Sequence, residues 1–176
     1  MITTFDLLAA HPFLTGLPAD QVERLARWAR RAPFRAGTRI FEENGRAQRC
    51  WFIRDGSVEL RTRVPGRGEV VVETLGPGSV LGWSWLFPPY RWHFAAVAVG
   101  PVLSIALDGA GVRALCRDDP ALGYELTTRF MAVVVARMQA TRLRLLDLHE
   151  ASAEGDLHQA SAEGDLHQAS AEGLGA

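Results

Sequence analysis

The order of apolar and polar positions divides the chain into a helical start, a strand-rich middle and a helical end. Near the N-terminus, apolar residues recur every three or four positions between Val22 and Ala29. This spacing predicts an amphipathic helix over residues 17–31. Pro18 and Asp20 suit the first turn of that helix, because proline tolerates the missing amide there and a carboxylate favours the positive end of the helix dipole.

From Pro33 to Leu107 the pattern changes to short apolar runs that are separated by turns rich in glycine, proline and asparagine. A series of short strands with such punctuation predicts an antiparallel sandwich or barrel. Within this region, Asp55-Gly56 lies between two apolar runs. An Asp-Gly pair in that position predicts a tight hairpin.

Helices return after Asp108, which can cap a short helix, and the pair Asp119-Pro120 is typical of the start of another. The second helix is long, and one apolar stripe repeats along it every three or four residues. The stripe consists of Leu126, Phe130, Val134, Met138, Thr141, Leu145 and Leu148. Since Met131 and Val135 add a second apolar face, we expect packing against the sheet along the first half and self-association farther on. The predicted dimer interface is Val134, Met138, Thr141, Leu145 and Leu148.

The C-terminal part is a repeat of nine residues. The sequence of Asp156–Gly164 recurs unchanged as Asp165–Gly173, and Asp147–Gly155 is a near copy. A period of nine matches neither seven nor eleven, so the repeat cannot keep one helix face toward a partner. We interpret Ala151–Ala176 as frayed helix or disorder, and its Asp and His residues as solvated low complexity rather than a metal site.

Composition limits the class of protein. The chain has 176 residues, of which 48% are hydrophobic, and a net charge of −1, which suits one globular domain and gives no electrostatic indication of nucleic-acid binding. Two cysteines, Cys50 and Cys116, do not make a disulfide framework or a thiolate cluster. No apolar run is long enough to cross a membrane, and the N-terminus does not read as a secretion signal, so we expect a cytoplasmic protein.

The segment from Gly78 to Val97 is the strongest candidate for a functional site. It combines a glycine turn, one short helical turn, a loop bounded by proline, and a strand entered through small residues. This layout lets backbone N–H groups converge on an anion. The segment holds Arg91 and His93 but no carboxylate. Arg91 is either a ligand contact or a solvated loop residue, and His93 is either a titrating ligand contact or an ordinary satisfied histidine.

The tryptophans of this segment also have two interpretations. Trp83 is equally consistent with stacking a planar ligand and with filling the barrel, whereas Trp85 and Trp92 are better explained by packing.

The order of helix, strands, anion-binding segment, short helix and long helix resembles the cyclic nucleotide-binding domain of the catabolite activator (CRP/FNR) family. The matching segments are Phe34–Phe41, Trp51–Leu60, Gly76–Gly78 and Ala136–Thr141, and the resemblance covers Phe13 to Leu148. It implies an α+β, mainly β, fold: an antiparallel double-stranded β-helix, or jelly roll, with flanking helices and a long C-terminal helix. We assign residues 1–149 to this domain, including a dimerisation helix, and residues 150–176 to the repeat tail.

The family's phosphate-binding cassette reads Gly-Glu-Leu and, after a loop, Arg-Ser/Thr-Ala. Gly82 and Ala95 match this pattern. Trp83 stands at the position of the ribose-binding glutamate, and His93 and Phe94 stand at those of the phosphate-binding arginine and its hydroxyl neighbour. A buried bond from arginine to phosphate is worth about 1.5–3 kcal/mol, so this cassette is expected to bind a cyclic phosphate more weakly.

The predicted ligand-binding residues are Gly82, Trp83, Ser84, Arg91, His93, Phe94, Ala95 and Thr141. Thr141 is included because it matches the threonine of the long helix that contacts the purine in cAMP-binding members of the family.

The resemblance implies a non-enzymatic regulatory or sensor module whose ligand is a cyclic nucleotide such as cAMP or another small anion. It would hold no metal, form a homodimer, and signal through its long helix to a protein partner, without binding nucleic acid or a membrane. The alternative is a ligand-free scaffold or regulatory subunit whose pocket is plugged by Trp83 and Phe94. A DNA-binding transcription regulator is disfavoured, because only the repeat follows the long helix where the family's helix-turn-helix would stand.

Overall fold

The structure is a computed structural model that describes the backbone of residues 2–172 and the side chains of residues 2–146. The chain divides into two compact units, Met1–Phe130 and Met131–Ala176. The expected boundary between residues 149 and 150 stays a prediction.

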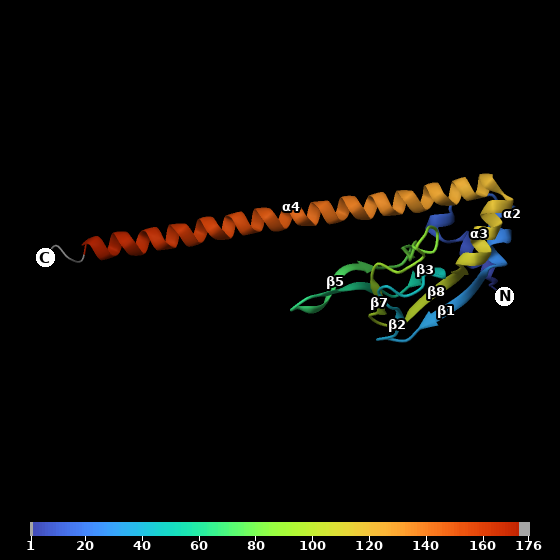
Figure 1. Cartoon of the computed structure of the whole chain (residues 1–176), viewed down its shortest axis with the longest axis horizontal. Coiled ribbons are helices and arrows are strands. Elements are labelled where there is room, and N and C mark those ends of the chain that lie inside the picture. Colours follow the sequence, from blue (N-terminus) through green and yellow to red (C-terminus); the bar gives the residue numbers. More distant parts are fainter. Residues whose placement is uncertain (1, 173–176) are drawn as a thin grey trace. The chain divides into compact units, whose positions relative to one another are not determined.

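The first unit contains a strand-rich body and short helices (Figure 1). Its helices are α1 (Thr4–Ala9), the 3-10 helix η1 (Pro12–Leu14), α2 (Ala19–Ala26) and α3 (Gly109–Asp118). Its strands are β1 (Ala29–Phe34), β2 (Arg39–Phe41), β3 (Arg49–Asp55), β4 (Val58–Val64), β5 (Gly68–Leu75), β6 (Val80–Leu81), β7 (Ala95–Ala98) and β8 (Val102–Asp108). Helix α4 (Pro120–Glu172) begins in this unit and continues through the second.

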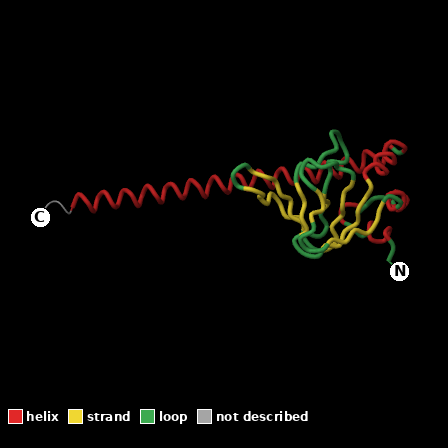
Figure 2. The backbone as a smooth tube through the Cα atoms, turned by 60° about the horizontal axis from the view of Figure 1, so that its bottom comes forward, coloured by secondary structure: helices red, strands yellow, loops and turns green. Residues whose placement is uncertain are grey.

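The strands form two four-stranded sheets, drawn in yellow in Figure 2, with the orders β1-β8-β3-β6 and β2-β7-β4-β5. Every pair of neighbouring strands is antiparallel. Strands adjacent in the sequence mostly belong to opposite sheets, which is the winding of a jelly roll. The predicted fold, an α+β jelly roll with flanking helices and a long C-terminal helix, is confirmed.

The turn at Asp55-Gly56 joins the two sheets and is not a tight hairpin, so that prediction was wrong. Strand β3 ends at Asp55 in the first sheet, and β4 begins at Val58 in the second. Gly56 has φ of +82°, and a Cβ atom there would lie 2.2 Å from the carbonyl oxygen of Pro101. The Asp-Gly pair therefore marks a turn that only glycine can make, but tertiary packing decides which strands the turn connects.

The predicted helix over residues 17–31 is too long. Helix α2 ends at Ala26, and β1 begins at Ala29, where it pairs with Leu107 of β8. The backbone of residues 29–31 finds its hydrogen-bond partners in a neighbouring strand, and such tertiary pairing outweighs a local helical spacing of apolar residues.

The ends of α3 and α4 follow the sequence signals. The Asp108 carboxylate accepts a hydrogen bond from the amide of Gly111 (2.8 Å), and the Asp119 carboxylate accepts one from the amide of Leu122 (3.1 Å). Pro120 then occupies the first position of α4. The hydrogen bond from Leu122 and the ion pair with Arg24 (2.5 Å) lower the pKa of Asp119. Both predicted caps are confirmed.

The first turns of α4 pack into the core of the first unit. Leu122, Leu126 and Phe130 are buried, and the Phe130 ring lies 4.8 Å from the ring of Phe13. Arg129 holds this part of the helix by donating hydrogen bonds to the carbonyl oxygens of Phe13 (2.7 Å) and Thr15 (2.9 Å). The first part of the apolar stripe therefore covers the core of the first unit.

The second unit is the remainder of α4. Large apolar side chains on it are exposed, among them Met131, Met138 and Leu145. The helical backbone continues through the repeats to Glu172, where the sequence suggested frayed helix or disorder, and residues 173–176 lie outside the described part. Within the described residues, every helix is too short or too polar to cross a bilayer.

His11 is a buried polar residue of the first unit. Its Nδ1 accepts a hydrogen bond from the amide of Phe13 (3.3 Å), so its Nε2–H donates to the carbonyl oxygen of Ile53 (3.2 Å). Burial lowers the pKa of His11 below its ordinary value of 6.5, with the hydrogen bond to Ile53 acting in the opposite direction. The neutral imidazole is thus the form that fits the core.

We expect the free energy of unfolding to fall as the pH falls below 6.5, because the unfolded chain then binds a proton at His11 that the folded chain excludes. Urea unfolding between about pH 7 and about pH 5 measures this slope, to which one such group contributes at most about 1.4 kcal/mol per pH unit. In His11→Gln the slope should become shallower while stability at pH 7 drops. Equal slopes in the two proteins would contradict the assignment.

Candidate functional site

The candidate site is the segment that leaves the first sheet at Leu81 of β6 and enters the second sheet at Ala95 of β7. We call residues 82–95 the cassette. It has a first arm, residues 82–86, a loop, and a second arm, residues 91–95. The expected short helical turn is a single turn, in which the amide of Leu86 donates to the carbonyl oxygen of Trp83 (2.9 Å).

The first arm begins where glycine is required for two reasons. Gly82 has φ of +81°, a conformation that side-chain-bearing residues rarely adopt, and a Cβ atom there would lie 2.7 Å from the ring of Trp92. The Trp92 ring is only 5% exposed and stacks on Phe41, with 4.0 Å between ring centroids. The space beside Gly82 is therefore filled by an indole from the second arm.

The second arm is held by the turn that follows β2. The amide of Trp92 donates to the carbonyl oxygen of Gly45 (2.9 Å), and its carbonyl oxygen accepts from the amide of Asn44 (2.8 Å). Arg91 is exposed, and its guanidinium donates to the carbonyl oxygen of Asn44 (2.7 Å). Arg91 thus clamps a loop backbone, in agreement with the interpretation of this residue as a solvated loop arginine.

A side-chain hydrogen bond joins the two arms. Ser84 Oγ lies 3.1 Å from His93 Nδ1, and either atom can donate, depending on the histidine tautomer. Ser84 is buried, whereas His93 is exposed. The structure therefore brings together two of the residues that the sequence predicted to bind a ligand.

Backbone amides without an acceptor flank this pair. The N–H groups of Ser84 and Trp85 in the first arm, and those of His93 and Phe94 in the second, donate no hydrogen bond within the part of the chain that the structure describes. Buried amides are nearly always paired with protein, water or a ligand. Because Ser84 and Trp85 are 5% and 1% exposed, these amides can be satisfied by a small anion or by ordered water.

The other aromatic residues of the cassette pack against the core. Trp83 and Phe94 are half-buried against it. Trp85 is fully buried, and its ring meets Phe130 edge-on at 5.5 Å. The packing interpretation of Trp85 and Trp92 is confirmed, while the stacking role proposed for Trp83 stays a prediction.

The Trp85 indole also affects the pKa of the buried thiol of Cys50. Its N–H has no hydrogen-bond partner in the described part of the chain, and the indole lies near the thiol of Cys50. Burial raises the pKa of Cys50, and the interaction with Trp85 offsets a part of that shift. Cys50 is therefore an unreactive core residue.

A cavity of about 490 Å³ adjoins the end of the cassette at Ala95. Arg61 of β4, which lies opposite Ala95 in the sheet, lines this cavity, but Glu59 binds its guanidinium at 2.6 Å. Glu43, another lining residue, accepts a hydrogen bond from Thr62 (2.9 Å). The charges here neutralise one another. Arg61 is not among the predicted site residues, because nothing along the chain indicates that β4 pairs with the strand of the cassette.

The remaining predicted site residue, Thr141, belongs to the second unit. It is exposed, and its hydroxyl donates to the carbonyl oxygen of Arg137 (2.9 Å). Its role in binding a base stays a prediction.

The predicted dimer interface also lies in the second unit. There Val134 is half-buried, Met138 and Leu145 are exposed, and the side chain of Leu148 lies outside the described part. Among the described residues, no group of three or more His, Cys, Asp or Glu side chains could hold a metal ion.

Known proteins resemble this chain in sequence and fold. Residues 31–119 match the family model of the Cyclic nucleotide-binding domain. The chain is similar to the solved structure of a putative cyclic nucleotide-binding protein from Geobacter metallireducens, with 30% identity over 78% of this chain and 99% of that one, and a TM-score of 0.70. No curated protein sequence matches the chain.

Two further solved structures share the fold. The catabolite activator protein of Thermus thermophilus is 25% identical over 76% of this chain and 61% of that chain, with a TM-score of 0.62. The regulatory domain of Toxoplasma gondii PKA, crystallised with cAMP, is 17% identical over 74% of this chain and 48% of that chain, with a TM-score of 0.63.

Replacement of Gly82 by alanine should destabilise the fold strongly, because alanine is strained at this φ and its methyl group collides with Trp92. The matched control is Gly37→Ala, since Gly37 has φ of +76° but open space around its Cβ position. We expect Gly82→Ala to cost about 1–3 kcal/mol more than the control in urea unfolding. Equal losses would mean that Trp92 does not pack where the structure places it.

Proposed function

Because the chain belongs to the cyclic nucleotide-binding domain family, we propose that it is a non-enzymatic regulatory module that binds a small anionic ligand of the cyclic nucleotide type at the cassette. In this proposal the occupancy of the cassette is passed through α4 to a protein partner.

The unpaired amides of the cassette carry the proposal. The N–H groups of Ser84, Trp85, His93 and Phe94 come from both arms, and the Ser84–His93 hydrogen bond holds the arms together. A phosphate can accept several backbone amides without any charged side chain, as at anion-binding nests. Ser84 Oγ and the His93 imidazole would add polar contacts, and Gly82 would let the backbone approach the ligand.

The cassette lacks the family's arginine and glutamate, and this lowers the affinity that we expect for a cyclic nucleotide. His93 is a single-point donor and does not replace a bidentate guanidinium, and Trp83 brings an apolar ring where a carboxylate would bind the ribose. The loss of one charge-assisted bond of about 1.5–3 kcal/mol corresponds to about 10- to 100-fold weaker binding. Weak affinity for cAMP, or preference for another small anion, is therefore expected.

Contact between the cassette and α4 supports signal transmission. Trp85 in the first arm packs edge-on against Phe130, which lies in the part of α4 that belongs to the first unit. A ligand that draws the amides of Ser84 and Trp85 toward itself would move the Trp85 ring and so act on Phe130. Such a ligand shifts the helix only as far as it binds one arrangement better than the other.

A second candidate function is a ligand-free scaffold or regulatory subunit. Trp92 beside Gly82 favours it, as do Trp83 and Phe94 packed against the core, because all three aromatic rings occupy volume at the cassette. In this reading water satisfies the unpaired amides.

Isothermal titration calorimetry with cAMP distinguishes the two candidates. The sensor proposal expects heat of binding from the wild-type chain and at least about tenfold tighter binding in Trp83→Glu with His93→Arg, since the pair restores the carboxylate and the guanidinium. Ser84→Ala, which removes only the hydroxyl, should weaken binding in either background. If the double variant folds but gains no affinity, the cassette register is wrong. If the wild-type chain gives no heat with cAMP, cGMP or inorganic phosphate and its tryptophan emission does not change, the scaffold is favoured.

Dimerisation through the exposed apolar stripe of α4 is tested by mass. We expect Met138→Asp with Leu145→Asp to convert a dimer into a monomer in light scattering at about 300 mM salt, where ionic attraction between copies is screened. The control is Gln139→Asp with Ala140→Asp, which adds the same charge to exposed positions off the stripe. A dimeric mass in both variants would contradict the assigned interface.

A further inference from the structure

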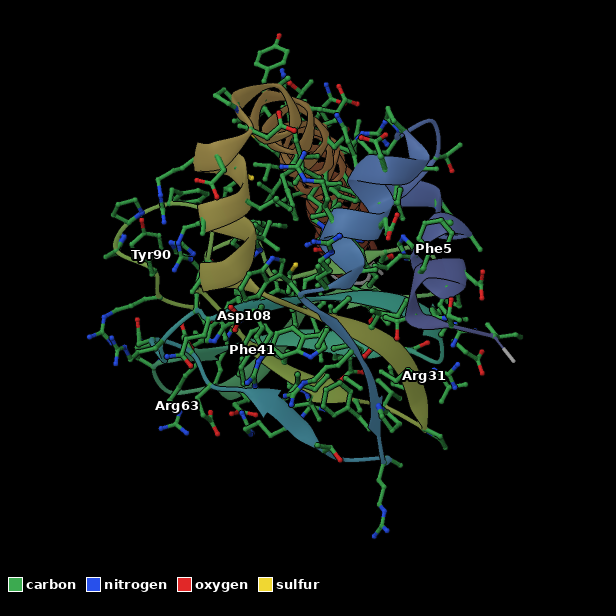
Figure 3. All side chains as sticks on the ribbon, turned by 90° about the vertical axis from the view of Figure 1, so that its right-hand side faces the viewer. Phe5, Arg31, Phe41, Arg63, Tyr90 and Asp108 are labelled. Atoms are coloured by element: carbon green, nitrogen blue, oxygen red, sulfur yellow. The ribbon has the colours of Figure 1, made fainter. Side chains whose placement is uncertain are left out.

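A surface with excess positive charge surrounds the start of α3. It adjoins the cassette, because Arg113 donates to the carbonyl oxygen of Trp85 and Arg46 forms a β-bridge with Arg91. Two cavities of about 280 and 290 Å³ share Asp108 as a lining residue. Arginines line both cavities, and we call this set the arginine surface: Arg27, Arg30, Arg46, Arg49 and Arg113. Asp108 is labelled in Figure 3 near the junction of α3 with the sheet.

Almost nothing neutralises this charge. Asp108 is the carboxylate that lines the two cavities, and its side chain already accepts a hydrogen bond from Gly111 as the cap of α3. Among the described residues, Arg27, Arg30, Arg46 and Arg49 form no ion pair with a carboxylate. Clustered arginines without counter-charges mark a surface that attracts an anionic partner.

Two aromatic side chains on this surface are held in place. Trp28 is 44% exposed, yet its ring lies so close to Gly111 that a Cβ atom there would be 2.0 Å away. Tyr90 is 37% exposed and carries the Arg113 guanidinium over its ring, 4.6 Å from the centroid. Rigid aromatic rings beside arginines reduce the entropy lost on binding and offer apolar contacts to the partner.

The chain itself carries the complementary charge. All 19 arginines and 13 of the 20 acidic residues lie in residues 1–146, which therefore have a net charge of +6. The remaining seven acidic residues lie in residues 147–176, which contain no arginine or lysine and have a net charge of −7. We call residues 147–176 the acidic repeat segment. Each repeat also contains one leucine between acidic positions, which suits a surface with exposed rings.

We propose that the arginine surface of one copy binds the acidic repeat segment of a second copy. The charge of −7 on the segment complements the arginines of that surface, and a second copy supplies the segment as part of its own α4. A nucleic acid is a poorer fit, because seven carboxylates tethered to every copy repel it and compete for the same arginines at high local concentration. This inference does not depend on whether the cassette binds a nucleotide.

A synthetic peptide of residues 147–176 with a fluorescent label tests the contact. The receptor is the full chain in which the seven acidic residues of the segment are replaced by their amides, so that its own segment does not compete. We expect saturable binding by fluorescence anisotropy that weakens at least about tenfold between about 50 and 200 mM salt.

Charge reversal identifies the surface. Arg30→Glu with Arg46→Glu in this receptor should weaken peptide binding at least about tenfold, since both side chains are exposed and lie on the arginine surface. The matched control is Arg35→Glu with Arg67→Glu, which changes the net charge equally at two exposed arginines outside it and should leave binding nearly unchanged. Equal losses in the two variants would reduce the effect to overall charge and overturn the proposal.

Two further outcomes would also overturn it. One is a single-stranded oligonucleotide that binds the wild-type chain through Arg30 and Arg46 while the peptide does not bind. The other concerns the full chain with Met138→Asp and Leu145→Asp, in which the apolar stripe is removed. At about 50 mM salt its mean mass in sedimentation should rise with protein concentration and fall back when the seven acidic residues are neutralised. A mass that does not change with concentration would mean that the segment does not join two copies.

Discussion

The contact between Gly82 and the Trp92 ring is the constraint on which the candidate site depends. Gly82 adopts a left-handed φ of +81° beside the Trp92 ring, and that ring stacks on Phe41 and so holds the second arm against the core. With both arms fixed, Ser84 and His93 meet, and their neighbouring amides are left without protein acceptors. The same packing that removes free volume beside Gly82 thus leaves these amides available to the proposed anionic ligand.

The cassette also connects the two sheets and contacts the first part of α4. It crosses from β6 to β7, so its arms belong to opposite sheets, and its buried Trp85 contacts Phe130. Arg113 of α3 donates to the carbonyl oxygen of Trp85 from the other side. The first arm therefore contacts both the first part of α4 and α3.

Positive and negative charges are separated between the two ends of this chain. The net charge of −1 is the sum of a basic folded part and an acidic repeat segment. Tertiary structure concentrates part of the basic charge: Arg27 and Arg30 follow α2, Arg46 and Arg49 lie around the start of β3, and the fold places them beside the N-terminus of α3. Residues far apart along the chain therefore form one surface.

The amino-acid sequence by itself determined the features that depend on neighbours in the chain. These are the strand-rich middle, the caps at Asp108 and Asp119, the glycine requirement of the Asp55-Gly56 turn, and the long apolar stripe of α4, because hydrophobic periodicity and capping act over a few residues. The family resemblance added the jelly-roll fold and the place of the cassette.

Only the tertiary structure decided which distant groups meet. It ended α2 at Ala26 because β1 pairs with β8, and it made Asp55-Gly56 a crossing between sheets. It placed the Trp92 ring beside Gly82, and it set Arg61 opposite Ala95. Such contacts depend on sheet register and side-chain volume across long sequence separations, which a local pattern does not encode.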